Sequence, residues 1–465
     1  PFNTGSRNGG LDWENVNPAR RKIIAYDFLY SCDQYPGAQG CDTPGAVGSL
    51  DNQGHGTHAA ATAAGDRGAP LAHDYADAIA PGAKLIIQDA GYIGGDLCSQ
   101  RPGIGCPVKL TPILEQAYKQ GARIHSNSWG DRQGSASLNP PTANYPQSAR
   151  DVDAFVYAHP DLLVVFNTGN LGAVGPTPQS SLSAPGSAKN TLQIGGTRTG
   201  SEDDDVIAAF TLFGPTRDGR IKPDLVAPAR VLAGDIDFDN RASTCDVSYQ
   251  SGTSWSAPSV AGAAALVRQY YTDGFYPSGA ATLANQFTPS AALLKATLIA
   301  AARPVPWRRN IINNQTVEAL PAPSYEQGWG FPVLDDALYF PGDARKLIVD
   351  NGELASNESK TLRVNVRAGT PFKAVLVWTD PPGVVRSVSD PTPQLVNDLD
   401  LRVNGVSNDD HLNNVEVIAI GEPSMGVSTI TISAPSLGVG PRQSYALVIT
   451  GDVSLVPLRT RSVRH

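Results

Sequence analysis

Gly252-Thr253-Ser254-Trp255-Ser256-Ala257-Pro258 opens a segment that stays apolar on nearly every side through Val267. Such a segment predicts a helix that is buried all round. Ser254 would then lie at the helix N-terminus, where unpaired backbone N–H groups and the positive end of the dipole favour the negative charge of acyl transfer. The alternative is an ordinary Ser or Thr N-cap of a helix. Other motifs in the chain are needed to decide between a reactive serine and an N-cap.

Two further stretches offer partners for Ser254. His55 lies in Gly54-His55-Gly56-Thr57-His58, before a run of small residues, and provides a general base; two histidines there would also suit half of a zinc site. Asn170 follows the apolar run 162–166, whose length and β-branching predict a strand buried on both faces. An Asn amide at the end of such a strand donates to an oxyanion, a role worth roughly 3 to 4 kcal/mol. Alone, Gly169-Asn170 is only a turn signal.

With these stretches, the chain resembles the subtilisin-like serine peptidases, and among them the oxidatively stable alkaline proteases, which carry a β-sandwich after the catalytic domain. The resemblance implies a serine endopeptidase acting on polypeptide substrates. In it, Ser254 attacks the peptide carbonyl, His55 shuttles the proton, and Asn170 with the Ser254 backbone N–H holds the oxyanion. It also implies substrate-binding roles for Ser128, Trp129, Gly130, Gly94 and Gly169. The stretches that carry it are residues 54–58, 121–130, 167–170, 214–224, 252–258, 327–330 and 395–401.

One position departs from the family pattern. The triad acid of the family sits in an Asp-Thr-Gly turn, and the counterpart here is Asn3-Thr4-Gly5. An Asp fixes the histidine tautomer and stabilises the imidazolium, whereas Asn cannot do the latter. The same change in another serine protease lowered kcat by about 10⁴, which is roughly 5 kcal/mol of barrier. We therefore expect attenuated peptidase activity, with an inactive binding or structural protein of this fold as the alternative. Asp27 lacks the small-residue turn and is interpreted as part of the next strand.

Two other departures lie beside the predicted site. Asn167-Thr168 replaces a small apolar pair of the family next to Asn170, which predicts a changed S1 pocket. Trp255 takes the place of a Met that makes many subtilisins sensitive to oxidation, so we expect peroxide to have little effect.

The pattern along the chain predicts two domains. Residues 1–341 alternate short apolar strands with helical stretches, which favours an α/β domain with a parallel sheet and helices on both faces. The resemblance places a further segment before residue 1. Residues 342–453 carry period-two strands separated by Gly, Pro and Asn, typical of a β-sandwich, in a jelly-roll-like arrangement. Residues 454–465 form a basic tail.

The composition of the chain limits the classes of partner that it is expected to bind. A net charge of −8 and a pI near 5.4 give no reason to expect nucleic acid, and no apolar run is long enough to span a membrane. We expect a monomer. Of the five cysteines, Cys32 with Cys41 and Cys98 with Cys106 form local pairs that suit disulfides, leaving Cys245; the alternative is five buried thiols. Disulfides and the resemblance together predict a secreted protein.

The second domain contains a predicted cation site. Asp380, Asn397, Asp398 and Asp400 offer hard oxygen ligands on loops and strand ends, as calcium requires. The resemblance also implies calcium there, and the alternative is turn chemistry with solvated carboxylates. No cofactor is expected for catalysis.

Overall fold

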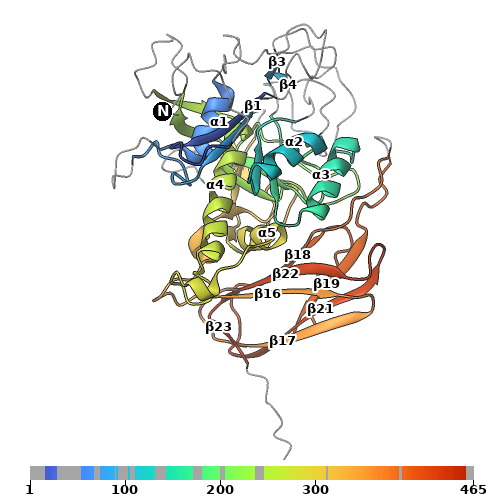
Figure 1. Cartoon of the computed structure of the whole chain (residues 1–465). Helices are drawn as coiled ribbons and strands as arrows, with labels where there is room; N and C mark the ends of the chain where they lie inside the picture. The colour runs from blue at the N-terminus through green and yellow to red at the C-terminus, as the bar shows by residue number, and fades with distance from the viewer. Residues whose placement is uncertain are drawn as a thin grey trace, which may run out of the picture. The chain divides into compact units, whose positions relative to one another are not determined.

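The structure of the chain is a computed structural model. It describes residues 16–28, 54–66, 74–89, 91–92, 103–104, 110–130, 143–170, 181–198, 205–235, 246–310, 313–386 and 390–456. Asn3, Gly94 and all five cysteines lie outside these ranges. The chain divides into two compact units (Figure 1). Unit 1 comprises residues 1–266, 304–331 and 384–392, and unit 2 comprises 267–303, 332–383 and 393–465. The expected domain boundary at residue 341 stays a prediction.

Unit 1 is built on parallel strands. Strands β5 (Ile124–Asn127), β6 (Leu163–Asn167), β7 (Leu192–Thr197) and β9 (Leu225–Pro228) pair in parallel, and β5, β6 and β7 continue into β8 (Val206–Ile207), β13 (Trp307–Arg309) and β14 (Thr316–Glu318). Every residue of β6 and β7 is buried, as expected for strands covered on both faces. The predicted parallel α/β sheet is therefore confirmed.

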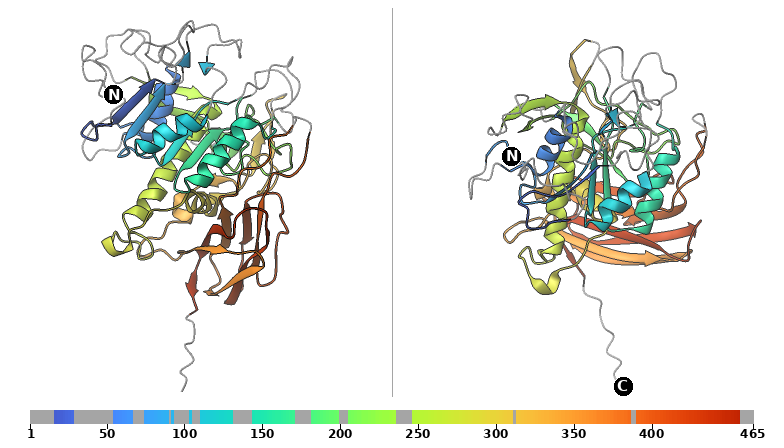
Figure 2. Two further views of the ribbon diagram at one scale, coloured as in Figure 1. Left: turned by 45° about the vertical axis from the view of Figure 1, so that its right-hand side comes forward. Right: turned by 45° about the horizontal axis from the view of Figure 1, so that its top comes forward.

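Four helices cover these strands. Helices α2 (Leu110–Lys119) and α3 (Gln147–Ala158) lie on one side, and α1 (His55–Ala64) and the first part of α4 (Thr253–Thr272) lie on the other (Figure 2). The spacing of Leu110, Leu114 and Ala117 puts the buried side chains of α2 on one face. The remaining strands of this part are β1 (Ile23–Phe28), β2 (Leu85–Asp89), β3 (Gly91–Tyr92), β4 (Gly103–Ile104), β10 (Arg230–Gly234) and β11 (Val247–Ser251). Asp27 belongs to β1, as interpreted from the sequence.

Unit 2 contains two antiparallel four-stranded sheets. One has the order β16-β22-β18-β20 and the other β19-β21-β17-β23. A single cluster of buried apolar side chains, including Ile348, Leu376, Val364 and Ile430, draws on both sheets, which supports the predicted sandwich. The strands are β16 (Lys346–Leu354), β17 (Glu358–Val366), β18 (Phe372–Trp378), β19 (Asn397–Val403), β20 (Val415–Ile420), β21 (Gly426–Leu437), β22 (Gln443–Gly451) and β23 (Val453–Leu455).

Helix α5 (Ala291–Ala300) packs on β18 and β22 of unit 2. Ser290 caps it by accepting a hydrogen bond from the Leu293 N–H at 3.1 Å. All ten helix residues are buried, so an apolar environment surrounds it. Shorter elements complete the chain: β12 (Ala302–Arg303), β15 (Phe331–Pro332) and the 3₁₀ turns Leu283–Asn285 and Leu334–Asp336.

Candidate active site

Ser254 lies in the first turn of α4, as the sequence predicts. The turn before it is held by Gly252, whose φ of 155° favours glycine and whose N–H donates to Ala229 O at 2.7 Å. Ser254 is buried, with 7% of the residue exposed, and its Oγ lies 3.5 Å from Ser128 O. In return, Ser128 Oγ donates to Ser254 O at 2.6 Å. These contacts join the serine turn to the end of β5.

The orientation of the Asn170 side chain is fixed by Thr253. Asn170 Oδ1 accepts hydrogen bonds from the backbone N–H of Thr253 at 2.8 Å and from its hydroxyl at 3.0 Å. Asn167 Nδ2 donates to the same hydroxyl at 3.2 Å. With Oδ1 occupied, the Nδ2 group of the exposed Asn170 side chain is left to donate outward, next to the N-terminus of α4. This is the arrangement that an oxyanion-binding amide requires.

His55 is the first residue of α1 and follows Gly54, which adopts a left-handed φ of 70°. Its ring lies 4.9 Å from that of Trp255, measured between centroids, and Trp255 follows Ser254 directly. The structure thus brings the base candidate to the serine turn.

His58 occupies a different environment from His55. It is fully buried, and its Nε2 lies 3.2 Å from Ser248 O. Burial lowers its pKa. Within the described ranges, neither His55 nor His58 belongs to a group of three or more His, Cys, Asp or Glu that could hold a metal ion, so geometry gives the zinc alternative no support.

The predicted substrate-binding segments face each other across Ser183. A Cβ on Gly130 would lie 2.6 Å from Ser183 Oγ, and one on Gly169 would lie 2.8 Å from Leu212 Cδ1. Ser183 Oγ donates to Thr168 O at 2.9 Å. The Trp129 ring packs edge-on against Phe166, with 5.4 Å between centroids. Side-chain atoms of Ser183 and Leu212 therefore fill the space that a Cβ would take at positions 130 and 169, and Gly169 also has a φ of 95°, which favours glycine.

Sequence reasoning missed three contributors to this site. Thr253 orients Asn170, Ser183 separates the two substrate segments, and Trp255 contacts His55. Their positions depend on contacts between elements far apart in the chain. Thr253 carried a signal, since it lies in the quoted serine stretch, but its hydroxyl looked like a cap.

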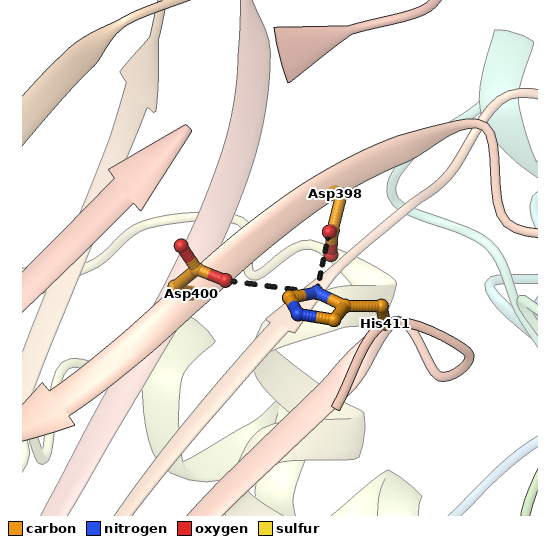
Figure 3. A group of neighbouring side chains, drawn as sticks. All are labelled: Asp398, Asp400 and His411. Carbon is orange, nitrogen blue, oxygen red and sulfur yellow. Dashed lines mark hydrogen bonds and ion pairs between the residues drawn. The ribbon is translucent and has the colours of Figure 1, made fainter. Parts of the chain in front are cut away.

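Two of the four predicted calcium ligands, Asp398 and Asp400, lie on β19 next to a histidine. Asp398, Asp400 and His411 each offer a ligand atom, all within 4.8 Å of one another (Figure 3). His411 Nδ1 lies 2.7 Å from Asp398 Oδ2 and 4.0 Å from Asp400 Oδ1. Asp398 Oδ1 is buried and has no hydrogen-bond partner in the described part of the chain.

The other two predicted calcium ligands, Asp380 and Asn397, make hydrogen bonds within unit 2. Asp380 accepts hydrogen bonds from the backbone N–H groups of Val396 and Asn397, at 3.0 and 2.7 Å. Asn397 accepts from Val439 N–H and donates to Gln443 Oε1. Their polar atoms shape the loop that precedes Asp398.

Comparison with known protein families identifies the family to which the chain belongs. The subtilase family model matches residues 40–330, more than half of the chain. The chain belongs to the subtilase family. This membership, with serine proteases among its relatives, supports a serine peptidase with a subtilisin-like α/β fold.

Two relatives and one solved structure are among the proteins that this subtilase is similar to. It is 24% identical over 595 residues to the serine protease/ABC transporter B family protein tagD of Dictyostelium discoideum, covering 96% of this chain and 30% of that protein. It is 30% identical over 226 residues to subtilisin BL of Lederbergia lenta, and the match covers 49% of this chain and 67% of subtilisin BL. The structure of Sphericase is 21% identical with a TM-score of 0.40, over 60% of this chain and 77% of Sphericase. The chain therefore spans about three tenths of the length of the Dictyostelium relatives.

No helix in the described ranges is both long and apolar enough to cross a membrane.

Proposed function

We propose that this subtilase is a serine endopeptidase in which Ser254 is the nucleophile, His55 the general base and Asn170 the side-chain donor of the oxyanion hole. The observation that carries the proposal is the pair of hydrogen bonds from Thr253 to Asn170 Oδ1, because it turns the amide donor toward the N-terminus of the serine helix. The Ser254 backbone N–H in the first turn of α4 supplies the second donor.

Substrate binding follows from the same elements. A peptide carbonyl would meet Ser254 Oγ, with Ser128, Trp129 and Gly130 on one side of the scissile bond and Gly169 on the other. We propose backbone pairing of the substrate with these segments, as in strand addition to an open edge. Gly94 is assigned to the same role from the sequence alone. The finer assignment to the oxidatively stable alkaline proteases, a secreted location and a monomeric state are part of this proposal.

Asn3 is the observation that favours the alternative function. Without a carboxylate at the acid position, a fold of this kind also serves as a binding or structural protein. The two functions differ in whether Ser254 reacts.

A fluorophosphonate probe tests the choice, with the labelled peptide mapped. We expect slow labelling of Ser254 in this chain, none in Ser254→Ala, and a rise of several hundredfold or more in Asn3→Asp, against the loss of roughly 10⁴ in kcat that Asp→Asn causes in another serine protease. Absence of labelling in both the original chain and Asn3→Asp would favour the binding protein.

We further propose that Asp398 and Asp400 hold a structural calcium ion. Two carboxylates with an orphaned buried oxygen fit a hard cation, and Asp380 and Asn397 shape the loop around them. Calcium there would add stability and no catalytic step. Removing calcium with EGTA should lower the melting temperature of this chain and leave that of Asp398→Asn/Asp400→Asn unchanged; equal melting temperatures with and without EGTA in the original chain would reject the site.

A further inference from the structure

Two segments of the chain have the sequence Asn-x-Ser/Thr, in which x is not proline. They are Asn314-Gln315-Thr316 and Asn357-Glu358-Ser359, and the sequence contains no third. This pattern is the acceptor of N-linked glycosylation, a modification of surface loops in proteins that pass through a secretory route. Whether such a segment can serve as an acceptor depends on the exposure of its asparagine.

Asn314 lies in the turn between β13 and β14 and adopts a left-handed φ of 54°. It is exposed, as are Gln315 and Thr316. Arg309 holds the turn, because its Nε donates to Asn314 Oδ1 at 3.0 Å and its Nη1 donates to Thr316 Oγ1 at 2.6 Å. Asn314 Nδ2, the atom that would carry a sugar, makes no hydrogen bond within the described ranges.

Asn357 lies in a second turn, between β16 and β17, with a left-handed φ of 63°. It is exposed, as are Glu358 and Ser359. The Asn357 backbone N–H donates to Ala434 O at 2.7 Å, which fixes the turn. Its side chain makes no hydrogen bond in the part of the chain that the structure describes. The amide nitrogen is therefore accessible at both positions.

Turn chemistry alone accounts for an asparagine in the left-handed region, but not for the rest of the pattern. Among the described residues, Asn404 and Asp409 also have left-handed φ values, of 52° and 49°. Neither has Ser or Thr two residues later, and Asn404 Nδ2 donates to Ser428 Oγ at 3.2 Å. Asn314 and Asn357 differ from these turn residues in having both the hydroxyl and an amide nitrogen without a hydrogen bond.

Both turns adjoin a strand at the edge of a sheet. Strand β14 comes last in the order of the seven-stranded sheet, and β16 comes last in the order β20-β18-β22-β16. Each therefore has one side without a partner strand among the described residues. An open strand edge can pair with another chain, and proteins commonly cover such edges. A glycan is bulky and solubilising, so one attached beside these strands would hinder that pairing.

We propose that Asn314 and Asn357 are N-glycosylation sites whose glycans shield the edges of β14 and β16. The donor is a lipid-linked oligosaccharide pyrophosphate. The amide nitrogen forms a bond to the anomeric carbon of the first sugar as the bond from that carbon to the pyrophosphate oxygen breaks. The lipid pyrophosphate leaves with the electron pair of the broken bond, and the amide gives up one proton. The inference rests on the secreted location within the proposed function, but not on peptidase activity.

Expression in two compartments of one eukaryotic cell tests the acceptor sites. The full chain would be produced behind a cleavable secretion signal and, in parallel, in the cytosol. We expect the secreted chain to carry two glycans that peptide N-glycosidase removes, converting each acceptor asparagine to aspartate, and the cytosolic chain to carry none. Mass spectrometry of the peptides locates the glycans. The peptide that contains Asn404 is the internal control and should stay unmodified.

Variants that remove only the hydroxyl give matched controls. Thr316→Ala should lose the glycan at Asn314 alone, and Ser359→Ala the one at Asn357 alone, because each leaves the left-handed asparagine in place. If either variant is not secreted, substitution of the asparagine itself by aspartate decides, since aspartate tolerates the same backbone conformation. A position that carries no glycan in the secreted chain is not an acceptor, and absence from both overturns the inference.

Fluorophosphonate labelling of the same secreted preparations, in the original chain and in Asn3→Asp, separates this result from the peptidase proposal. Labelled Ser254 without glycans overturns only the glycosylation inference. Glycans without labelling in either version support the inference and count against the peptidase.

Light scattering below the melting temperature tests the shielding of the strand edges. We expect secreted Thr316→Ala/Ser359→Ala to aggregate severalfold faster than the secreted original chain, because its strand edges are uncovered. The cytosolic forms of both proteins lack glycans and should aggregate at equal rates, which shows that the substitutions themselves are not the cause. Equal aggregation rates of the two secreted proteins would overturn the shielding role.

Discussion

At the scale of single residues, the candidate site depends on short polar side chains that fix one another. Asn170 contributes little unless its amide faces the right way, and Thr253 determines that through two hydrogen bonds to Oδ1. The sequence motifs contained both residues, but they predicted a role only for Asn170, as the oxyanion donor. The orientation of an amide follows from its hydrogen-bond partners, which sequence spacing does not contain.

Asn170→Ala should therefore lower kcat by about 10² to 10³ with little change in KM, since an oxyanion donor acts mainly in the transition state. Kinetics with a peptide ester would be measured in the Asn3→Asp version to keep the rates within range. Thr253→Val is the matched control: it removes one of the two hydrogen bonds and leaves the backbone one, so a smaller loss is expected. Equal kcat in Asn170→Ala and its parent would remove Asn170 from the oxyanion hole.

Gly130 is required by a contact with Ser183. A Cβ at position 130 would lie 2.6 Å from Ser183 Oγ and 3.1 Å from Ala184 O. We expect Gly130→Ala to lower the melting temperature and raise KM, and Ser183→Gly added to it to restore part of both. Calorimetry and steady-state kinetics on the two single variants and the double variant check this. Additive losses would show that the two segments are not adjacent.

At the scale of elements, the sequence predicts those with strong apolar patterns. The run 162–166 gives β6, and the apolar segment after Ser254 gives α4, which continues to Thr272. The start of helix α3 at Gln147 does not follow from the sequence, because the first turn of the helix is largely polar and has no apolar periodicity. Side-chain networks between elements were not predicted, since they depend on which strands become neighbours.

Strand β5 carries one such network. His125 Nε2 donates to Gln88 Oε1 on β2 at 2.9 Å, and His125 Nδ1 accepts from Asn127 Nδ2 at 2.9 Å. Gln88 Nε2 in turn donates to Ile113 O at 3.0 Å. The chain of hydrogen bonds suits a neutral imidazole, and desolvation lowers the pKa of His125 to about 4.

Acid should therefore destabilise the fold through His125. Between pH 6.5 and pH 4, the unfolded chain binds a proton that the folded chain does not, so stability falls as pH falls through this window. The loss attributable to this group is at most about 3 kcal/mol. Urea unfolding at pH 7 and pH 4.5 should show a smaller pH difference for His125→Gln than for the original chain. A pH difference that is the same in both proteins would contradict this role.

At the scale of the whole molecule, the alternation of periods along the chain predicts an α/β unit followed by antiparallel sheets, and the two units contain these. The sequence did not predict that residues 267–303 group with the antiparallel sheets. Helix α5 is buried on all sides, so its sequence pattern does not indicate which element it packs against. Within unit 2, α5 packs on β18 and β22. A lysine on β18, Lys373, donates to Ile299 O and Ala302 O at the end of this helix, at 3.4 and 2.7 Å.

Lys373 and buried tyrosines together predict an alkaline optimum of stability. Burial lowers the pKa of Lys373 to about 8, so between pH 8 and pH 10.5 the unfolded chain binds more protons and stability rises with pH. Burial also raises the pKa of Tyr270 to about 12 and raises that of Tyr271, so above pH 10 the unfolded chain loses protons first and stability falls. Burial also raises the pKa of Glu416 to about 8, so its own loss of stability is largely complete by pH 9, and urea unfolding from pH 9 to pH 11 should pass through a maximum near pH 10.

Lys373→Met separates the two contributions. The rise between pH 9 and pH 10 should largely disappear, by at most about 3 kcal/mol, because no buried amine remains to be deprotonated on folding. The fall above pH 10 should persist, since both tyrosines remain. The matched control is Lys360→Met, whose amine pairs with Asp350 at the surface and should leave the shape of the profile unchanged. A rise of the same size in Lys373→Met would mean that another group of the chain sets the alkaline stability.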